Sequence, residues 1–227
     1  MNLFNKIIAA VSITALSSVM VYASDEVKFD TPEQILEASK NVKIDFKEGV
    51  HYKVIEGNAL SEKKEVREFF SFFCGHCHAL LPTINKITQI LPEDVYFVGN
   101  PVHYLGGHMG VEFQKSYAAA ASMQMNEQFT NFFDKKIYDE NKIPQSHEEL
   151  VNMVTELGIP KDVFEKQYKS FPIQNMANQY KQKTMDSKIQ GVPTVVVNNK
   201  YSLITKNISN EAEYYALIMY LVNKDYK

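Results

Sequence analysis

The spacing of apolar residues changes around a Cys-Gly-His-Cys sequence, and this change constrains the fold more than any other feature of the chain. Residues 66–73 (VREFFSFF) carry apolar side chains on both faces of an expected strand, which is typical of a central, covered strand. From Gly75 onward, the apolar residues follow helical spacing, at Leu80, Ile84, Ile87 and Leu91. Cys74 and Cys77, the only cysteines, are therefore expected where a buried strand is followed by a helix.

The rest of the chain divides into strand-rich parts and one long helical part. Further strands are expected at 51–55, 95–98, 194–197 and 201–204, the last two joined by a turn at Asn198-Asn199. The strand at 95–98 should run parallel to 66–73, because a right-handed helical crossover joins them. Between 107 and 189 the pattern is helical. These elements predict an α/β domain interrupted by an all-helical one.

Capping residues place the ends of several helices. Thr31 to Gln34 form a capping box with Pro32 at the first helical position, so a helix is expected to about Lys40. Ser146 to Glu149 form a second capping box within the helical part, and Gly158 to Pro160 should end the helix that it begins. Asn210 is a candidate cap for a last helix over 211–222.

Charge and targeting signals limit the function classes. The formal charge is -3, and Arg67 is the only arginine, so the chain lacks the basic stripe that a nucleic-acid binder needs. Lys6, the apolar residues 7–22 and the small residue Ala23 resemble a secretory signal peptide, so residues 1–23 are expected to be removed. An uncleaved membrane anchor is the alternative. Export would deliver the chain to an oxidising compartment, where disulfides form.

The position of the two cysteines predicts dithiol chemistry. A helix N-terminus presents unpaired N–H groups and a positive dipole end, and we expect these to favour a thiolate at Cys74. His76, when protonated, adds a second positive neighbour. The thiolate is the attacking group in disulfide exchange. Cys77 lies one helical turn further on, where it is better covered and can resolve a mixed disulfide.

The cysteine pair allows three other interpretations. A structural zinc site usually needs four ligands, and no second cysteine pair is present. A structural disulfide across two intervening residues would constrain little of the unfolded chain. The most serious alternative is covalent c-type haem, because Cys74 to His78 match the pattern C-x-x-C-H with His78 as axial ligand. The apolar strand that leads directly into Cys74 favours a thioredoxin-type site over haem.

Three segments resemble the DsbA family of periplasmic thiol:disulfide oxidoreductases. Glu68 to Cys74, followed by x-His-Cys, is similar to that family's active-site strand; Gly191-Val192-Pro193 is similar to its second active-site loop; and Val102 to Gly107 resembles the approach to its inserted helical domain. The resemblance implies a thioredoxin-like fold with an inserted all-helical domain. The expected boundaries are an N-terminal extension at 24–45, the thioredoxin-like domain at 46–106 and 190–227, and the helical insertion at 107–189.

The resemblance also implies roles for individual residues. A cis Val192–Pro193 bond would face the cysteine pair, and the backbone of Val192 would pair with an extended substrate, as in strand addition. Glu68 would be a buried acid below Cys77, with a raised pKa, that shuttles a proton during exchange. The four phenylalanines between Glu68 and Cys74 are expected to be core residues.

The implied function is the introduction of disulfides into exported proteins in the periplasm. The implied partners are reduced, unfolded client proteins and a DsbB-like membrane quinone reductase that restores the disulfide; a monomer without a cofactor is expected. Two residues depart from the family pattern. Gly75 replaces a usual proline and makes the active-site helix similar to that of protein disulfide isomerases, so an isomerase or reductase of the same fold is the alternative. Gly99 stands where a lysine can accompany the buried glutamate.

Overall fold

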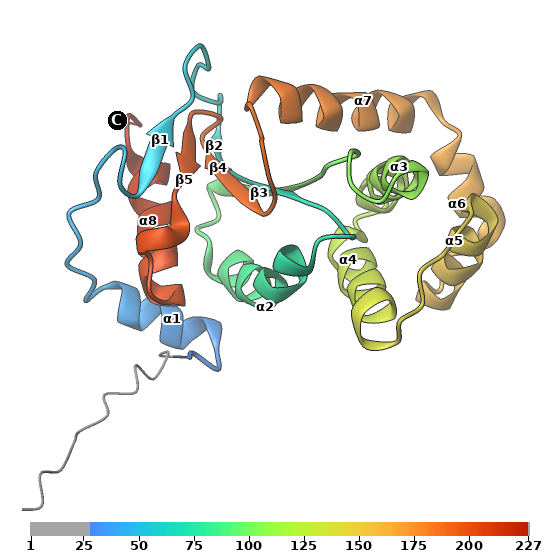
Figure 1. Ribbon diagram of the computed structural model, residues 1–227, viewed down its shortest axis with the longest axis horizontal. Helices are drawn as coiled ribbons and strands as arrows, with labels where there is room; N and C mark the ends of the chain where they lie inside the picture. The colour runs from blue at the N-terminus through green and yellow to red at the C-terminus, as the bar shows by residue number, and fades with distance from the viewer. Residues whose placement is uncertain (1–27, 227) are drawn as a thin grey trace, which may run out of the picture.

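A five-stranded sheet forms the centre of one half of the molecule (Figure 1). The computed structural model describes residues 28–226, so the expected signal peptide lies outside the described residues. The strands are β1 (Tyr52–Val54), β2 (Lys64–Phe70), β3 (Val95–Pro101), β4 (Thr194–Val197) and β5 (Tyr201–Leu203), in the order β1-β5-β4-β2-β3. As predicted, β2 and β3 are parallel; the other neighbours are antiparallel. Asn198 and Asn199 both have positive φ values in the turn between β4 and β5, which confirms that turn.

Three helices accompany the sheet: α1 (Pro32–Ser39), α2 (Gly75–Ile90) and α8 (Glu211–Asn223). The predicted caps of α1 and α8 are confirmed. Thr31 and Gln34 form the capping box of α1, and the Asn210 side chain accepts a hydrogen bond from the Glu213 N–H at the start of α8. Helix α1 packs against α2 and α8, so the segment before β1 is part of this half of the fold.

The chain between β3 and β4 is helical, as predicted, and forms the other half of the molecule in Figure 1. Its helices are α3 (His108–Ser122), α4 (Asn126–Asp134), α5 (His147–Val154), α6 (Lys161–Tyr168) and α7 (Phe171–Asp186), with a π-helical turn at Lys135–Asp139 and a 3-10 turn at Thr155–Leu157. Helix α3 packs against α4, α6 and α7. Buried aromatic side chains, among them Phe113, Phe129 and Phe133, fill the space between these helices.

One of the predicted strand boundaries was wrong. The strand expected at 66–73 ends at Phe70, and residues 71–73 form a turn in which the Cys74 N–H donates to the Ser71 carbonyl at 3.2 Å. Hydrophobicity alone could not show this turn, because Phe72 is buried within it, against the helical half. Further along, the helical part turns at Ser170, between the end of α6 and the start of α7.

A polar network ties the sheet to the helical half. Arg67 forms two hydrogen bonds with the Glu65 carboxylate, of 2.9 and 3.0 Å, and a third with Asn100 Oδ1 at 3.1 Å. Asn100 in turn donates to the Tyr180 carbonyl of α7 at 3.1 Å. The only arginine of the sequence therefore binds a carboxylate and an amide of its own chain, and its guanidinium is not free to bind an anionic ligand. Within residues 28–226, no helix is long and apolar enough to cross a membrane.

Candidate active site

Cys74 is the N-cap residue of α2, directly after the turn that follows β2. Its backbone is extended, and its carbonyl accepts hydrogen bonds from the N–H groups of Cys77 and His78 at 2.9 and 3.1 Å. The sulfur therefore lies at the positive end of the helix dipole, next to N–H groups of the first turn. The prediction that this cysteine stands between a buried strand and a helix is confirmed. Cys74 is half-buried, which leaves its sulfur accessible to a partner thiol.

Cys77 lies in the first turn of α2 and is buried, at 5% exposure. It packs in the same cluster as Phe70 and Phe72, at the junction between the sheet and the helical half. Burial raises the pKa of the Cys77 thiol far above its ordinary value, because a charged thiolate would lose its hydration there. Both cysteines are free thiols in this structure. The pair is therefore asymmetric: one sulfur is accessible at a helix end, and the other is covered and held in its neutral form.

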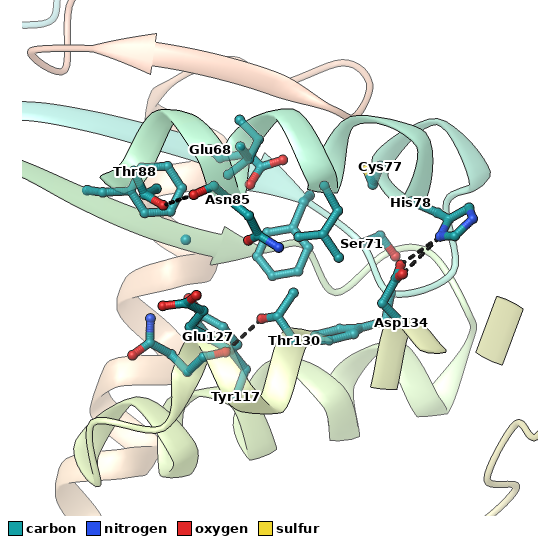
Figure 2. A pocket seen from close by; sticks show the side chains of 17 residues that line it. Glu68, Ser71, Cys77, His78, Asn85, Thr88, Tyr117, Glu127, Thr130 and Asp134 are labelled. Atoms are coloured by element: carbon teal, nitrogen blue, oxygen red, sulfur yellow. Dashed lines mark hydrogen bonds and ion pairs between the residues drawn. The ribbon is translucent and has the colours of Figure 1, made fainter. Parts of the chain in front are cut away.

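Glu68 lies on β2, six residues before Cys74, and is almost completely buried. Burial raises the pKa of its carboxyl to about 8, so the group is mainly a neutral acid at pH 7. Glu68 and Cys77 line the same cavity, of about 100 Å³, which Figure 2 shows between β2, α2 and α4. A buried acid beside a buried thiol can give and take the proton that the thiol needs during exchange.

The second loop lies directly against Cys74. The Val192–Pro193 peptide bond is cis, as the resemblance implies, and the Cys74 thiol donates to the Val192 carbonyl at 3.4 Å. Pro193 also lines an open groove of about 820 Å³, together with His76, Leu80 and Tyr214. A chain bound across this loop would therefore lie next to the Cys74 sulfur.

His76 is exposed between the two cysteines. Within the described part of the chain, its ring has no hydrogen bond or ion pair with another side chain. The ring lines the same groove as Pro193, so it faces the space in which a bound chain would lie. The geometry is compatible with the expected positive neighbour, and the role itself stays a prediction.

His78 has partners that sequence reasoning missed. Its Nδ1 atom lies 2.9 and 3.1 Å from the two carboxylate oxygens of Asp134 in α4, and its ring stacks on Tyr138 with a centroid distance of 4.3 Å. Burial raises the pKa of Asp134, and the contact with His78 opposes that shift. Asp134 lies 56 positions from His78, and no local pattern links two residues so far apart. The residue considered as a haem ligand is thus a bridge between α2 and the helical half.

Gly99 pairs with Glu68 in the register of β2 and β3, and the space beside it is already filled. A Cβ atom at Gly99 would lie 2.2 Å from the hydroxyl oxygen of Tyr117 and 3.1 Å from its ring. Tyr117 comes from α3, is buried, and lines the cavity shared by Glu68 and Cys77. The phenol from α3 therefore takes the space in which a side chain at position 99 would accompany the buried acid.

Replacing Gly99 with alanine should destabilise the protein by about 1–3 kcal/mol, because the new methyl group would force the buried Tyr117 out of place. Urea unfolding of the reduced protein would measure the loss. The double variant Gly99→Ala with Tyr117→Phe is the control, since it removes the oxygen that the Cβ would strike. Equal destabilisation by Gly99→Ala in both backgrounds would contradict this explanation.

The side chains around the cysteine pair include several that could in principle bind a metal. Among residues 28–226, no three His, Cys, Asp or Glu side chains come together as a metal site would need. Two donors near the cysteines have other surroundings: His78 contacts Asp134, and Glu68 is a buried neutral acid.

Comparisons with known proteins agree with this geometry. Residues 65–216 match the family described as DSBA-like thioredoxin domain. The thiol:disulfide interchange protein DsbA of Pseudomonas aeruginosa is 33% identical over 163 residues, which are 72% of this chain and 76% of that protein. DsbA of Escherichia coli K12 is 26% identical, over 70% of this chain and 76% of that protein.

Solved structures of DsbA proteins are also similar to this chain. The crystal structure of Pseudomonas aeruginosa DsbA superposes with a TM-score of 0.70 at 30% identity, and the match covers 79% of this chain and 94% of that one. A Proteus mirabilis DsbA variant with a non-covalently bound peptide has a TM-score of 0.70 at 24% identity, over 79% of this chain and 97% of that one. The match spans both the sheet and the helices inserted between β3 and β4. The chain thus belongs to the DsbA family of thioredoxin-like thiol:disulfide oxidoreductases, with Cys74 and Cys77 as its CXXC pair.

Proposed function

We propose that this chain is a periplasmic dithiol oxidase that passes the Cys74–Cys77 disulfide to reduced, unfolded proteins after their export. The observation that supports this direction of transfer most strongly is the asymmetry of the pair. Cys74 lies at a helix N-terminus, where a thiolate is favoured, and Cys77 is buried. An oxidase needs a stable reduced form, and the position of Cys74 at a helix N-terminus is the feature that supports one here.

The reaction begins when a client thiolate attacks the sulfur of Cys74. The Cys74–Cys77 bond breaks, a client–Cys74 mixed disulfide forms, and the Cys77 sulfur leaves with the electron pair. Because burial strongly disfavours a Cys77 thiolate, that sulfur takes a proton as it leaves. Glu68 is the proposed proton donor, since it shares the cavity with Cys77 and is a neutral acid at pH 7.

A second client thiolate then attacks the client sulfur of the mixed disulfide and releases Cys74 as a thiolate. Two electrons have passed from the client to the enzyme, which is now a dithiol. We assign client docking to the backbone of Val192 and to the groove lined by Pro193 and His76, which lies next to the attacked sulfur. Main-chain pairing makes few sequence demands, which suits an enzyme with many clients. A DsbB-like membrane quinone reductase is the proposed oxidant of the dithiol form.

The proposed direction of transfer predicts the redox potential of the cysteine pair. Equilibration with reduced and oxidised glutathione should give a redox potential between about -120 mV, the value for DsbA, and about -180 mV, the value for protein disulfide isomerase. An intermediate potential is expected because Gly75 makes the active-site helix resemble that of the isomerase. Alkylation of the free thiols followed by mass spectrometry would measure the reduced fraction. A value below about -250 mV, near that of thioredoxin, would assign a reductase instead.

A further inference from the structure

The cavity beneath Cys77 extends from the buried acid of β2 to the contact between α2 and α4. Glu68 of β2, Cys77 and His78 of α2, and Asp134 of α4 line it, with Cys77 next to His78 and Asp134 opposite His78 (Figure 2). Its other polar lining residues are Ser71, Asn85, Thr88, Tyr117, Asn126, Glu127 and Thr130. Apolar side chains complete the wall and form its larger part: Phe70, Phe72, Leu81, Ile84 and Phe97. A volume of about 100 Å³ has room for several water molecules beside the polar side chains, since each needs roughly 10–15 Å³ of such space.

The His78–Asp134 pair lies where this cavity approaches solvent. The exposed fractions of the two side chains are 39% for His78 and 21% for Asp134, whereas Glu68 is almost completely covered. His78 directly follows Cys77 in the first turn of α2, and Asp134 is the last residue of α4. The two carboxylate oxygens of Asp134 and the ring of Tyr138 hold the imidazole in place.

His78 differs from the other titratable residues that line the cavity in the sign of the charge that it can carry. The titratable groups that line it besides His78 are Glu68 from β2, Cys77 from α2, Tyr117 from α3, and Glu127 and Asp134 from α4. Tyr138 of the following π-helical turn stacks on His78, and Asp139 of the same turn lies near Asp134. No lysine or arginine lines the cavity in the described part of the chain. His78 is thus the only lining side chain that can carry a positive charge and exchange a proton near neutral pH.

We propose that His78 and Asp134 exchange protons between solvent and Glu68 through this cavity, and that they are positioning residues for the step at Cys77. The inference rests on the proposed roles of Cys77 and Glu68. When client thiolate attacks Cys74, the Cys77 sulfur takes the proton of the Glu68 carboxyl. The Glu68 carboxylate is then reprotonated through cavity water by the His78 imidazolium, and His78 regains its proton from solvent. Asp134 keeps the ring oriented.

The test is the pH profile of disulfide transfer from the oxidised protein to a reduced two-cysteine peptide, followed by stopped-flow fluorescence between pH 5 and 9. Asp134→Asn and His78→Ala should lower the rate by about 10-fold at pH 8, where protons are scarce, and by less at pH 6. Added imidazole should restore the rate of His78→Ala at pH 8, which it could not do for a misfolded variant.

Asn131→Ala is the matched control. It removes the Asn85–Asn131 hydrogen bond of 2.8 Å, a second contact between α2 and α4. Asn85 lines the cavity, but neither asparagine carries a titratable group, so the proton path proposed here is left intact. Its pH profile should follow that of the unaltered protein. An unchanged profile for Asp134→Asn, equal losses in Asn131→Ala, or no rescue by imidazole would overturn the inference. If Glu68→Gln also left the profile unchanged, the proposed role of Glu68 would fall as well; a changed Glu68→Gln profile would leave that role standing.

Discussion

Replacing Cys74 with alanine should reduce disulfide transfer to client peptides by more than about 1,000-fold, because it removes the only accessible sulfur of the pair. The remaining thiol, Cys77, is buried and strongly disfavoured as a thiolate. The rate at which a reduced, fluorescently labelled two-cysteine peptide becomes oxidised would measure the loss.

Cys77→Ala is the informative counterpart. It leaves the accessible Cys74 in place but removes the sulfur that could attack Cys74 and release a bound client. When the Cys74 thiolate of the variant attacks the disulfide of an oxidised client protein, one client sulfur leaves as a thiolate and the resulting mixed disulfide should accumulate. Non-reducing gels and intact mass would detect the complex. Two results for Cys74→Ala would show that the nucleophile has been assigned to the wrong residue. One is near-normal peptide oxidation, and the other is a client bound covalently to the Cys77 sulfur of that variant.

Glu68→Gln should make the protein more stable, and the gain should grow with pH. The pKa of Glu68 is about 8 in the folded protein, against an ordinary value of 4.5. Between these two values the unfolded chain has lost a proton that the folded chain still holds, so the stability of the unaltered protein falls as pH rises. Each pH unit in this window corresponds to about 1.4 kcal/mol. The advantage of the glutamine variant should thus rise from near zero at pH 4 to on the order of 4 kcal/mol at pH 8.

Urea unfolding of the reduced proteins at pH 4, 6 and 8 would measure this difference. Glu62→Gln is the matched control, because Glu62 is an exposed carboxylate in the loop just before β2. Its stability should parallel that of the unaltered protein at every pH. A constant difference between Glu68→Gln and the unaltered protein across this range would show that Glu68 titrates like an exposed carboxylate, which would also remove it as the proton donor.

Local patterns were sufficient where a neighbour in sequence determines the structure. The capping box at Thr31 places the start of α1, Asn198-Asn199 places the turn between β4 and β5, and Asn210 places the start of α8. The same holds for the position of Cys74 between a buried strand and a helix. In each case the side chain or φ angle that decides the structure lies within a few residues of the element that it begins or ends.

Contacts between distant segments could not be predicted in this way. Nothing near His78 in the sequence indicates Asp134, and nothing near Gly99 indicates that the Tyr117 hydroxyl fills the space beside it. Both contacts arise because the inserted helices pack against the active-site helix and the sheet. The burial of Glu68 is an intermediate case. A single acid in an apolar strand does not by itself distinguish a solvated face from a buried site, and the packing of the helical half buries it.

The most direct measurement is the fate of two hydrogen atoms when the oxidised protein meets one equivalent of a reduced two-cysteine peptide. After acid quenching within seconds, intact mass spectrometry should show that the protein has gained the mass of two hydrogens and that the peptide has lost it. Peptide mapping should place both new thiols at Cys74 and Cys77. A protein that kept the Cys74–Cys77 disulfide while the peptide stayed reduced would contradict the central claim that this pair is an oxidant of client dithiols.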